Sequence, residues 1–459
     1  MSDLIFARAQ MGFSLAFHII FAVAGIALPL MMVIAEALWL KTGDETYKTI
    51  TKRWARGTAV LFAVGAVSGT VLSFELGLLW PEFMKWAGSI IGLPFALEGY
   101  AFFTEAIFLG IYLYGWDKVS RPMHLLSGCI VALSGALSAV FVVIANAWMN
   151  APVGFKLVGN LPTEIDPIKA MTSPAAFPQV LHMLIAAYAA IGLLAAGVHS
   201  FLLLKDRTNV FHRRALGICL ALGCTMAIAE PLSGDILAQM VAHTQPIKLA
   251  ALEGQFDTMR GAPLRIGGWP DVEAKQTPYS IEIPKMLSML AYHDLDATVK
   301  GLKDFPRDEW PPVLLVHLNF QMMVMCGVIM GLVSLWGAAL YLKTKRLPDS
   351  PAFLKAVVGI SPLGLLAIES GWMVTELGRQ PWVIHGVIRT SHAVTPMPGL
   401  WLPFSTFLVV YIVLAVIVVM LLIREFSRSQ DASTQPQDSH SQNPEDPSAA
   451  GKSKDVRHE

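Results

Sequence analysis

Long apolar stretches constrain this 459-residue chain more than any other feature of its sequence. Nine stretches each hold about 20 or more mostly apolar residues, the length that an α-helix needs to cross a bilayer. Backbone polar groups cannot stay unpaired in hydrocarbon, so each stretch should be helical. The sequence therefore predicts an all-α integral membrane protein of about nine transmembrane helices. These spans lie near residues 11–40, 57–79, 93–115, 124–147, 181–204, 215–239, 312–342, 353–377 and 400–423.

The composition excludes several other classes of protein. Hydrophobic residues make up 54% of the chain and charged residues only 15%, whereas soluble domains have nearer a quarter charged. The formal net charge is zero, which gives no indication of nucleic-acid binding. All four cysteines lie in apolar segments without a CxxC or CxxCH pattern, which argues against zinc ribbons and covalent c-type haem. They are Cys129, Cys219, Cys224 and Cys326.

Basic residues in alternate short loops predict the orientation. By the positive-inside rule these loops face the cytoplasm, so the N-terminus is expected outside and the C-terminus inside. The membrane domain then covers 1–424, with a long outer loop at 240–310 between spans 6 and 7. The segment 425–459 has few apolar residues to bury and is expected to be a disordered cytoplasmic tail. The basic loop residues include Lys41, Lys48, Lys52, Arg53, Arg56, Lys118, Arg121, Lys205, Arg207, Arg213, Arg214, Lys343, Lys345 and Arg346.

Four side chains that can bind iron fall at one depth, toward the outer face. They are His18 in span 1, His182 in span 5, Met323 in span 7 and Glu376 at the end of span 8. An imidazole with a thioether suits a six-coordinate electron-transfer haem, whereas a single ligand leaves one position open for oxygen. His182 with Met323 could form the first kind of site, and His18 and Glu376 the second. Singly, each could instead be a satisfied core histidine, a packing methionine or half of a helix-end ion pair.

Further polar residues in the apolar or outer segments are candidates for moving protons. Glu98 and Glu105 are seven residues apart in span 3 and share a helix face. They could form a relay or simply pair with polar groups in the bundle. In the outer loop, Lys248 and Glu253 lie five residues apart, and a solvated amphipathic turn is the alternative interpretation for them.

The motifs around these residues resemble subunit I of cytochrome bd-type quinol oxidases. The resemblance covers almost the whole chain to about Arg424. It rests on GRQPW at 378–382, which includes Arg379, and on ARAQMGFSLAFHIIFAV with His18. It also rests on LEGYAFFTEAIFLGIYLYGW, NAWMNAPVGF, TQPIKLAALEG and HLNFQMMVMCG, the last of which contains Met323.

This resemblance implies two haem b groups and one haem d. A low-spin haem b would lie between His182 and Met323, and a close pair of haems would use His18 and Glu376. Which of these two ligands holds haem d stays open. Trp372 could supply an apolar wall to a haem. Gln321 stands where some members carry an arginine, so the properties of the low-spin haem stay open.

The resemblance also implies residues for quinol and proton chemistry. Lys248 and Glu253 match residues of the family's outer Q-loop that are implicated in quinol oxidation, and the loop here is of the short form. Glu105 matches an acid near haem d. The spacing from Glu98 is one residue shorter than in other members, which leaves the role of Glu98 open.

The implied function is a terminal respiratory oxidase of the bacterial cytoplasmic (inner) membrane. Quinol would be oxidised at the outer face and O2 reduced to water with cytoplasmic protons, forming a proton gradient without pumping. The implied partner is a second polytopic subunit, with room for a small single-span subunit, in a lipid bilayer. Alternatives are a b-type cytochrome that passes electrons elsewhere and a cofactor-free transporter. The choice of ubiquinol or menaquinol and the sensitivity to cyanide stay open.

Overall fold

The computed structural model describes residues 3–159 and 161–434. Within them, nine helical segments are long and apolar enough to cross a membrane, which confirms the expected number. They are α1 (Asp3–Thr42), α2 (Glu45–Leu79), α3 (Pro81–Tyr114), α4 (Arg121–Asn150), α6 (Ala176–Lys205), α7 (Val210–Thr244), α10 (Val313–Thr344), α11 (Pro351–Ile360) continued by α12 (Leu363–Leu377), and α13 (Trp401–Thr434).

Several helices begin earlier or end later than the apolar stretches that predict them. Asp3 begins α1 and Pro81 begins α3, so both helices extend beyond the apolar stretches expected near 11–40 and 93–115. Proline at the first helical position suits a helix start because its missing N–H has no intrahelical partner there. The last helix continues to Thr434, so 425–434 is helical where disorder was expected. The rest of the expected tail lies outside the described residues.

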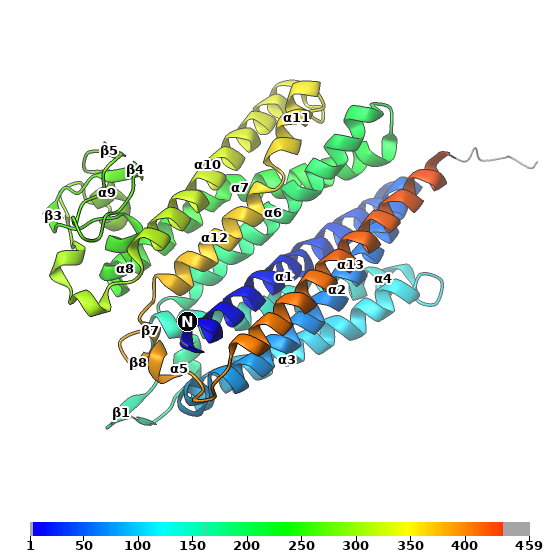
Figure 1. The fold of residues 1–459 in the computed structure, drawn as a ribbon. Helices are drawn as coiled ribbons and strands as arrows, with labels where there is room; N and C mark the ends of the chain where they lie inside the picture. The colour runs from blue at the N-terminus through cyan, green and yellow to red at the C-terminus, as the bar shows by residue number, and fades with distance from the viewer. Residues whose placement is uncertain (1–2, 160, 435–459) are drawn as a thin grey trace, which may run out of the picture.

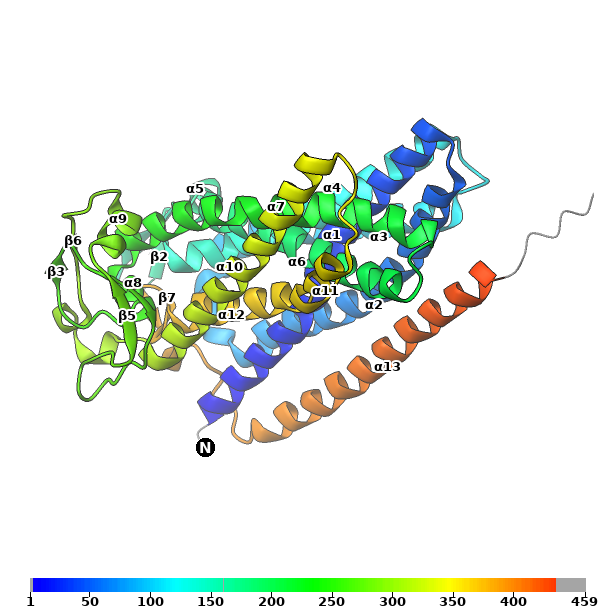
Figure 2. The ribbon, with the colours of Figure 1, turned by 90° about the horizontal axis from the view of Figure 1, so that it is seen from above.

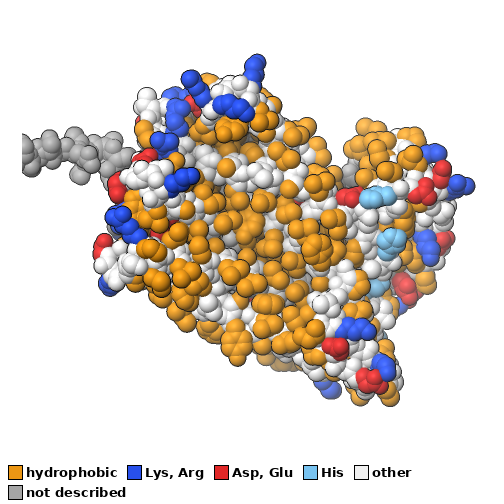
Figure 3. All heavy atoms as spheres, turned by 180° about the vertical axis from the view of Figure 1, so that it is seen from behind, with side chains coloured by type: hydrophobic (Ala, Val, Ile, Leu, Met, Phe, Trp, Pro, Cys, Tyr) orange, Lys and Arg blue, Asp and Glu red, His pale blue; other side chains and the backbone are white. Residues whose placement is uncertain are grey.

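The long helices run side by side, and most of the short elements gather beyond one end of them (Figures 1 and 2). One group contains α1 to α4 and α13, and the other contains α6, α7 and α10 to α12. The central helix α1 packs on α2, α4, α6 and α13, so it joins the two groups. Apolar side chains cover the middle of the face in Figure 3, and charged side chains gather toward its edges, as expected for a bilayer-spanning surface.

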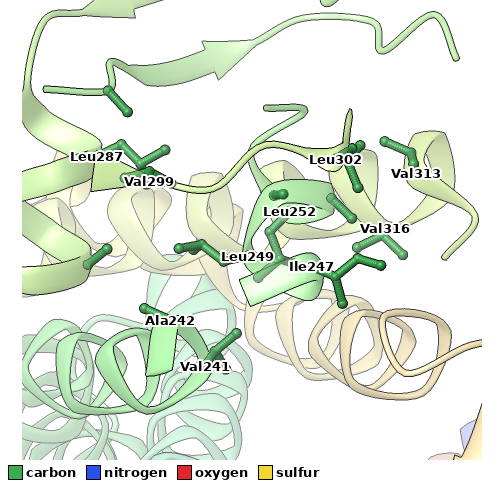
Figure 4. Close-up of a cluster of buried hydrophobic side chains, with 14 of the residues drawn as sticks. Val241, Ala242, Ile247, Leu249, Leu252, Leu287, Val299, Leu302, Val313 and Val316 are labelled. Atoms are coloured by element: carbon green, nitrogen blue, oxygen red, sulfur yellow. The ribbon is translucent and has the colours of Figure 1, made fainter. Parts of the chain in front are cut away.

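The segment between α7 and α10 folds into a cap rather than an extended loop. It contains α8 (Pro246–Leu252), β3 (Met259–Arg260), β4 (Leu264–Gly267), β5 (Ser280–Ile283), α9 (Met286–Tyr292), β6 (Thr298–Val299), η1 (Leu302–Asp304) and η2 (Arg307–Glu309). The strands pair antiparallel as β3 with β6 and β4 with β5. Apolar side chains of α8, α9 and η1 pack on the adjoining ends of α7 and α10 (Figure 4). This buried cluster includes Leu249, Leu252, Leu287, Leu302, Val313 and Val316.

Other short elements connect the remaining helices. A hairpin of β1 (Lys156–Val158) and β2 (Leu161–Thr163) with α5 (Pro167–Met171) links α4 to α6. The pair β7 (Trp382–Ile384) and β8 (Ile388–Arg389), followed by η3 (Thr390–His392), links α12 to α13. The first residues of α1 lie nearby, because Asp3 accepts hydrogen bonds from the backbone N–H groups of Gly399 and Leu400.

Small residues let the helices of the second group approach closely. A Cβ added at Gly192 on α6 would lie 2.7 Å from the Cα of Gly223 on α7. The eighth span breaks at Ser361 and Pro362, and Ser361 packs where a Cβ on Gly197 of α6 would lie. In a bilayer, close packing of small residues stabilises helix pairs because the lipid provides little hydrophobic drive between helices.

Gly192→Ala should therefore destabilise the protein. The added methyl must push α6 away from α7, and overpacking of this kind costs about 1–3 kcal/mol. Gly110→Ala is the control, because a Cβ at Gly110 meets nothing within 4 Å. Thermal unfolding of the purified protein should show a lower midpoint for the first variant only. Equal midpoints in the two variants would contradict the packing argument.

Candidate functional site

His18 on α1 is held in one tautomer by Ser68 on α2. Its Nδ1 lies 2.9 Å from the Ser68 Oγ. The single hydroxyl hydrogen of Ser68 is donated to the backbone carbonyls of Val64 (2.9 Å) and Gly65 (3.1 Å), so Oγ must accept from the imidazole Nδ1–H. The lone pair of Nε2 is then free, which is the form of histidine that binds a metal.

His182 on α6 repeats this arrangement with residues of α7. Its Nδ1 lies 3.0 Å from the Ser233 Oγ, which donates its hydrogen to the Glu230 carbonyl at 2.8 Å. The Glu230 carboxylate lies 3.2 Å from the same Nδ1. Two acceptors therefore face Nδ1–H, and the Nε2 lone pair is again free to bind a metal.

Met323 lies on α10 and packs against Gly371 of α12, the helix on which α10 mainly packs. Ala189 and Met330 belong to one buried cluster, and they lie seven residues beyond His182 and Met323 respectively. Residues seven apart share a helix face, so His182 lies on the same face of α6 as Ala189, and Met323 on the same face of α10 as Met330. Gly371 on α12 admits the thioether, because a Cβ there would lie 3.1 Å from the Met323 sulfur. Trp372, the next residue, packs with the apolar cluster between α1 and α6.

Glu376 lies at the end of α12 in a polar network. One carboxylate oxygen accepts from the Asn146 side chain of α4, and the other accepts from Arg379 at 2.5 Å. Glu376 and Arg379 therefore form the helix-end ion pair that was the alternative interpretation of this stretch. The Arg379 side chain is only 2% exposed, and its Nε and Nη1 have no hydrogen-bond partner among the described residues. Buried unpaired donors of this kind suit an anionic group such as a haem propionate.

Lys248 belongs to the same network rather than to the surface of the cap. Its Nζ donates to the Asn150 side-chain oxygen at 3.0 Å and to the Thr375 carbonyl at 3.2 Å. Gly378 makes room for it, since a Cβ there would lie 2.7 Å from the Lys248 Cε. Burial lowers the pKa of the Lys248 amine to about 7, with a further decrease from the Arg379 charge and an opposing effect of Glu376.

Glu253 is buried too, but it faces another part of the cap. Burial raises the pKa of the Glu253 carboxyl to about 7, and the backbone N–H and guanidinium of Arg265 oppose this shift. Gln321 on α10 holds β4, the strand that contains Arg265. Its side chain accepts from the Gly267 N–H and donates to the Arg265 carbonyl. No hydrogen bond joins Lys248 to Glu253 in the described part of the chain, so the two candidate residues occupy separate surroundings.

The two acids of α3 differ in burial. Glu105 is 5% exposed and lies between α1 and α4, where a Cβ on Gly135 would come within 3.2 Å of its carboxyl oxygen. Glu98 lies two turns nearer the cap and is half-buried. Only Glu105 is thus enclosed by neighbouring helices.

Sequence reasoning missed the residues that orient these groups. Asn146 and Asn150 could have been found from the sequence, because they place two amides four residues apart at the end of an apolar span. Ser68 and Ser233 have none, because a serine within a membrane helix usually bonds its own backbone. Gln245 is also new to the site: its side-chain amide donates to the Asn150 carbonyl.

These features define a multi-pass membrane protein whose bundle carries imidazoles with free ring nitrogens and a buried, partly unpaired arginine. Residues 6–430 match the family described as cytochrome bd terminal oxidase subunit I. The chain belongs to that family. It is therefore a subunit of a haem-containing terminal oxidase of respiratory electron transport, and such oxidases work with a second subunit.

Individual relatives agree with this assignment. A Bacillus subtilis (strain 168) protein assigned as a cytochrome bd menaquinol oxidase subunit I is 39% identical over 93% of this chain and 97% of its own length. Cytochrome bd ubiquinol oxidase subunit 1 of the same strain is 31% identical over 94% of this chain and 95% of its own length. The bd oxidase structure from Geobacillus thermodenitrificans superposes with a TM-score of 0.87 at 38% identity, covering 93% of this chain and 99% of that chain.

Replacing Ser233 by Ala should weaken the site at His182. The variant loses an acceptor that orients the imidazole, and losing such a partner typically lowers metal affinity about 10- to 100-fold. Haem content and the reduced-minus-oxidised spectrum of the purified protein measure the effect. Ser73→Ala on α2 is the control, since that exposed serine bonds only the backbone of its own helix. Equal haem content in both variants would show that Ser233 does not orient a ligand.

Glu253→Gln should stabilise the cap increasingly as the pH rises. The folded carboxyl keeps its proton up to about pH 7, whereas the unfolded one loses it near its ordinary pKa of 4.5. The stability that comes from this proton is therefore lost as the pH rises through 7, and glutamine avoids the loss. The gain should be at most about 3 kcal/mol above pH ~7 and vanish near pH ~4.5.

Hydrogen exchange of the cap at several pH values measures this difference. Glu273→Gln is the control, because its side chain is 92% exposed. If hydrogen exchange in the Glu253→Gln protein were slower only at low pH, the raised pKa of Glu253 would be contradicted.

Proposed function

We propose that this chain is the quinol-oxidising and oxygen-reducing subunit of its complex. The observation that carries the proposal is the repeated device in which a serine fixes Nδ1–H of a buried histidine and leaves Nε2 free, at His18 and at His182. Two such imidazoles, a thioether and a carboxylate at one end of the bundle fit the ligand set of haem iron.

The proposed assignment gives each ligand a role. His182 and Met323 hold a low-spin haem b, whereas His18 and Glu376 hold the two remaining haems, one b and one d. When bound, these groups would supply one-electron transfer and the binding of O2. Arg379 would pair with a haem propionate through Nε and Nη1, which are buried and have no hydrogen-bond partner among the described residues. Trp372 packs with the apolar cluster between α1 and α6 and would supply an apolar wall to a haem.

Quinol oxidation is assigned to the cap. Quinol must give up two protons, and Glu253 can accept one because its pKa of about 7 leaves a large fraction unprotonated at neutral pH. Lys248 takes part by holding α8 against Asn150 and the end of α12. One relative is named for menaquinol and one for ubiquinol, so oxygen consumption with each quinol identifies the preferred substrate.

The cap is assigned to the outside of the bacterial cytoplasmic membrane. The basic interhelical loops lie at the opposite end of the long helices, and the positive-inside rule places those loops in the cytoplasm. Protons from quinol would then leave on the outside, and Glu105 and Glu98 would bring cytoplasmic protons to oxygen. This vectorial chemistry builds a gradient without a pump. The second subunit is assigned as polytopic, with a small single-span subunit as a further partner.

His182→Ala should remove one low-spin haem from the purified complex. The reduced-minus-oxidised spectrum should lose the corresponding band, and quinol-driven oxygen consumption should fall by at least about 100-fold, because removing the ligand interrupts electron transfer. His243→Ala is a control for replacing a histidine near the cap, since His243 only packs on Tyr292. An unchanged spectrum would remove the assignment of His182. A colourless wild-type complex would favour a cofactor-free transporter.

A further inference from the structure

A buried pair of ionisable residues lies near the ends of α1 and α4 that are remote from the cap. The Nδ1 of His124 on α4 is 2.7 Å from a carboxyl oxygen of Glu36 on α1, and their side chains are 3% and 0% exposed. The other ring nitrogen of His124 lies 2.9 Å from the Tyr112 carbonyl of α3. Three helices therefore meet at this pair, and none of the roles above uses it.

Donor and acceptor chemistry shows how many protons the pair holds. The Tyr112 carbonyl can only accept, so the Nε2 of His124 must carry a hydrogen. The 2.7 Å contact between Nδ1 and Glu36 then needs one more proton, which lies either on the imidazole or on the carboxyl group. In both forms the pair is neutral overall and shares one transferable proton.

Polar groups continue from this pair toward Glu105. The second carboxyl oxygen of Glu36 and the Tyr112 hydroxyl are buried without a hydrogen-bond partner among the described residues. On α4, Gly128 leaves space for the Tyr112 ring and Gly135 leaves space for the Glu105 carboxyl. Tyr112 and Glu105 are seven residues apart on α3, as Gly128 and Gly135 are on α4. Along the contact between α3 and α4, the Tyr112 side chain and the Glu105 side chain therefore lie about two helical turns apart, each beside a glycine of α4.

Two tryptophans separate the pair from a basic surface. The Trp116 ring packs on His124 with centroids 4.1 Å apart, and Trp39 lies against Trp116. Lys52 lies over the Trp116 ring, whereas Lys48 and Arg121 lie over the Trp39 ring. Glu45 accepts from the Trp39 indole, and Cys129 on α4 is another titratable group in the neighbourhood. The pair is therefore one aromatic layer away from the loops assigned to the cytoplasm.

We propose that Glu36 and His124 form a proton-loading site that supplies Glu105. This inference rests on the proposed function, because only oxygen reduction consumes protons there. The shared proton leaves the pair for the Tyr112 hydroxyl, which donates its own hydrogen onward to Glu105, and a cytoplasmic proton then reloads the pair. Gly25, which faces Glu105, and Glu36 are eleven residues apart on α1, or about 16 Å along the helix, so hydrogen-bonded water would complete the route.

A purely structural pair makes a different prediction. In Glu36→Gln, the amide can donate to a neutral Nδ1 while Nε2–H still donates to Tyr112, so the helix contact persists without a transferable proton. If the pair only joins α1 to α4, this variant should behave like wild type. If it loads protons, the variant should keep its haems but take up protons slowly.

The test uses the purified complex of both subunits with Glu36→Gln, Glu36→Asp and the control Glu82→Gln, an exposed acid of α3. Haem content and the reduced-minus-oxidised spectrum report whether the complex is intact. Flash photolysis of carbon monoxide from the reduced complex in the presence of O2 then separates O2 binding, which needs no proton, from later proton uptake, followed with a pH-indicator dye.

We expect Glu36→Gln to bind O2 at the wild-type rate and to take up protons about 10-fold or more slowly. Glu36→Asp should recover part of the rate, and Glu82→Gln should match wild type. Proton uptake within twofold of wild type in an intact Glu36→Gln complex would overturn the proposal.

If Glu36→Gln does not bind haem, His124→Asn gives the same test, because its amide can still donate to Glu36 but carries no transferable proton. Loss of haem in all variants of the pair would make the pair structural and would also overturn the proposal. Failure of the proposed function is distinguishable, because the wild-type complex itself would then not consume O2 with quinol.

Discussion

The structure depends on one constraint, that a polar group inside a membrane bundle must find a partner within the protein. The chain meets it with short hydrogen-bonded sets that join neighbouring helices. Ser68 orients His18 across α1 and α2, and Ser233 orients His182 across α6 and α7. Each set satisfies one ring nitrogen and leaves the other free. The same contacts that satisfy buried polar groups therefore also orient the two imidazoles.

The cap is coupled to the bundle by polar contacts as well as by its apolar core. Lys248 and Gln245 bond to Asn150 at the end of α4, and Asn150 bonds in turn to Asn146, which donates to Glu376. A continuous set of hydrogen bonds thus links the segment assigned to quinol with the carboxylate assigned to a haem. Lys248 packs closely against Gly378, so a shift of α8 would displace the Lys248 side chain. The hydrogen bonds through Asn150 and Asn146 would transmit that displacement to Glu376.

The buried polar groups at the two ends of the bundle meet this constraint in different ways. Near the cap, the buried Nε and Nη1 of Arg379 have no hydrogen-bond partner in the described part of the chain, an arrangement that suits an anionic group. At the far end, Glu36 and His124 neutralise each other. Between them, Glu105 is an isolated acid enclosed by α1 and α4. An acid without a fixed counter-charge, such as Glu105, can gain or lose a proton. The pair of Glu36 and His124 shares one proton, and another proton must replace it when it leaves.

Much of the fold follows from the sequence because membrane spans are read from local composition. The apolar runs predicted all nine spans of the described residues. The helix ends were less predictable, since α3 begins at Pro81 and α13 continues to Thr434, beyond the apolar runs. Helical hydrogen bonding extends past the hydrocarbon layer, so hydropathy alone does not mark where a helix stops.

By itself the sequence determined the class of protein, the number of spans and which side chains could bind iron, because each depends on residue type and on neighbours along one helix. Only the tertiary structure decided which helices face one another. That arrangement buried Lys248 beside Asn150 rather than beside Glu253, placed Ser68 and Ser233 against the two histidines, and brought Glu36 to His124 from 88 residues away. These contacts join residues from different helices, and no local pattern in the sequence encodes them.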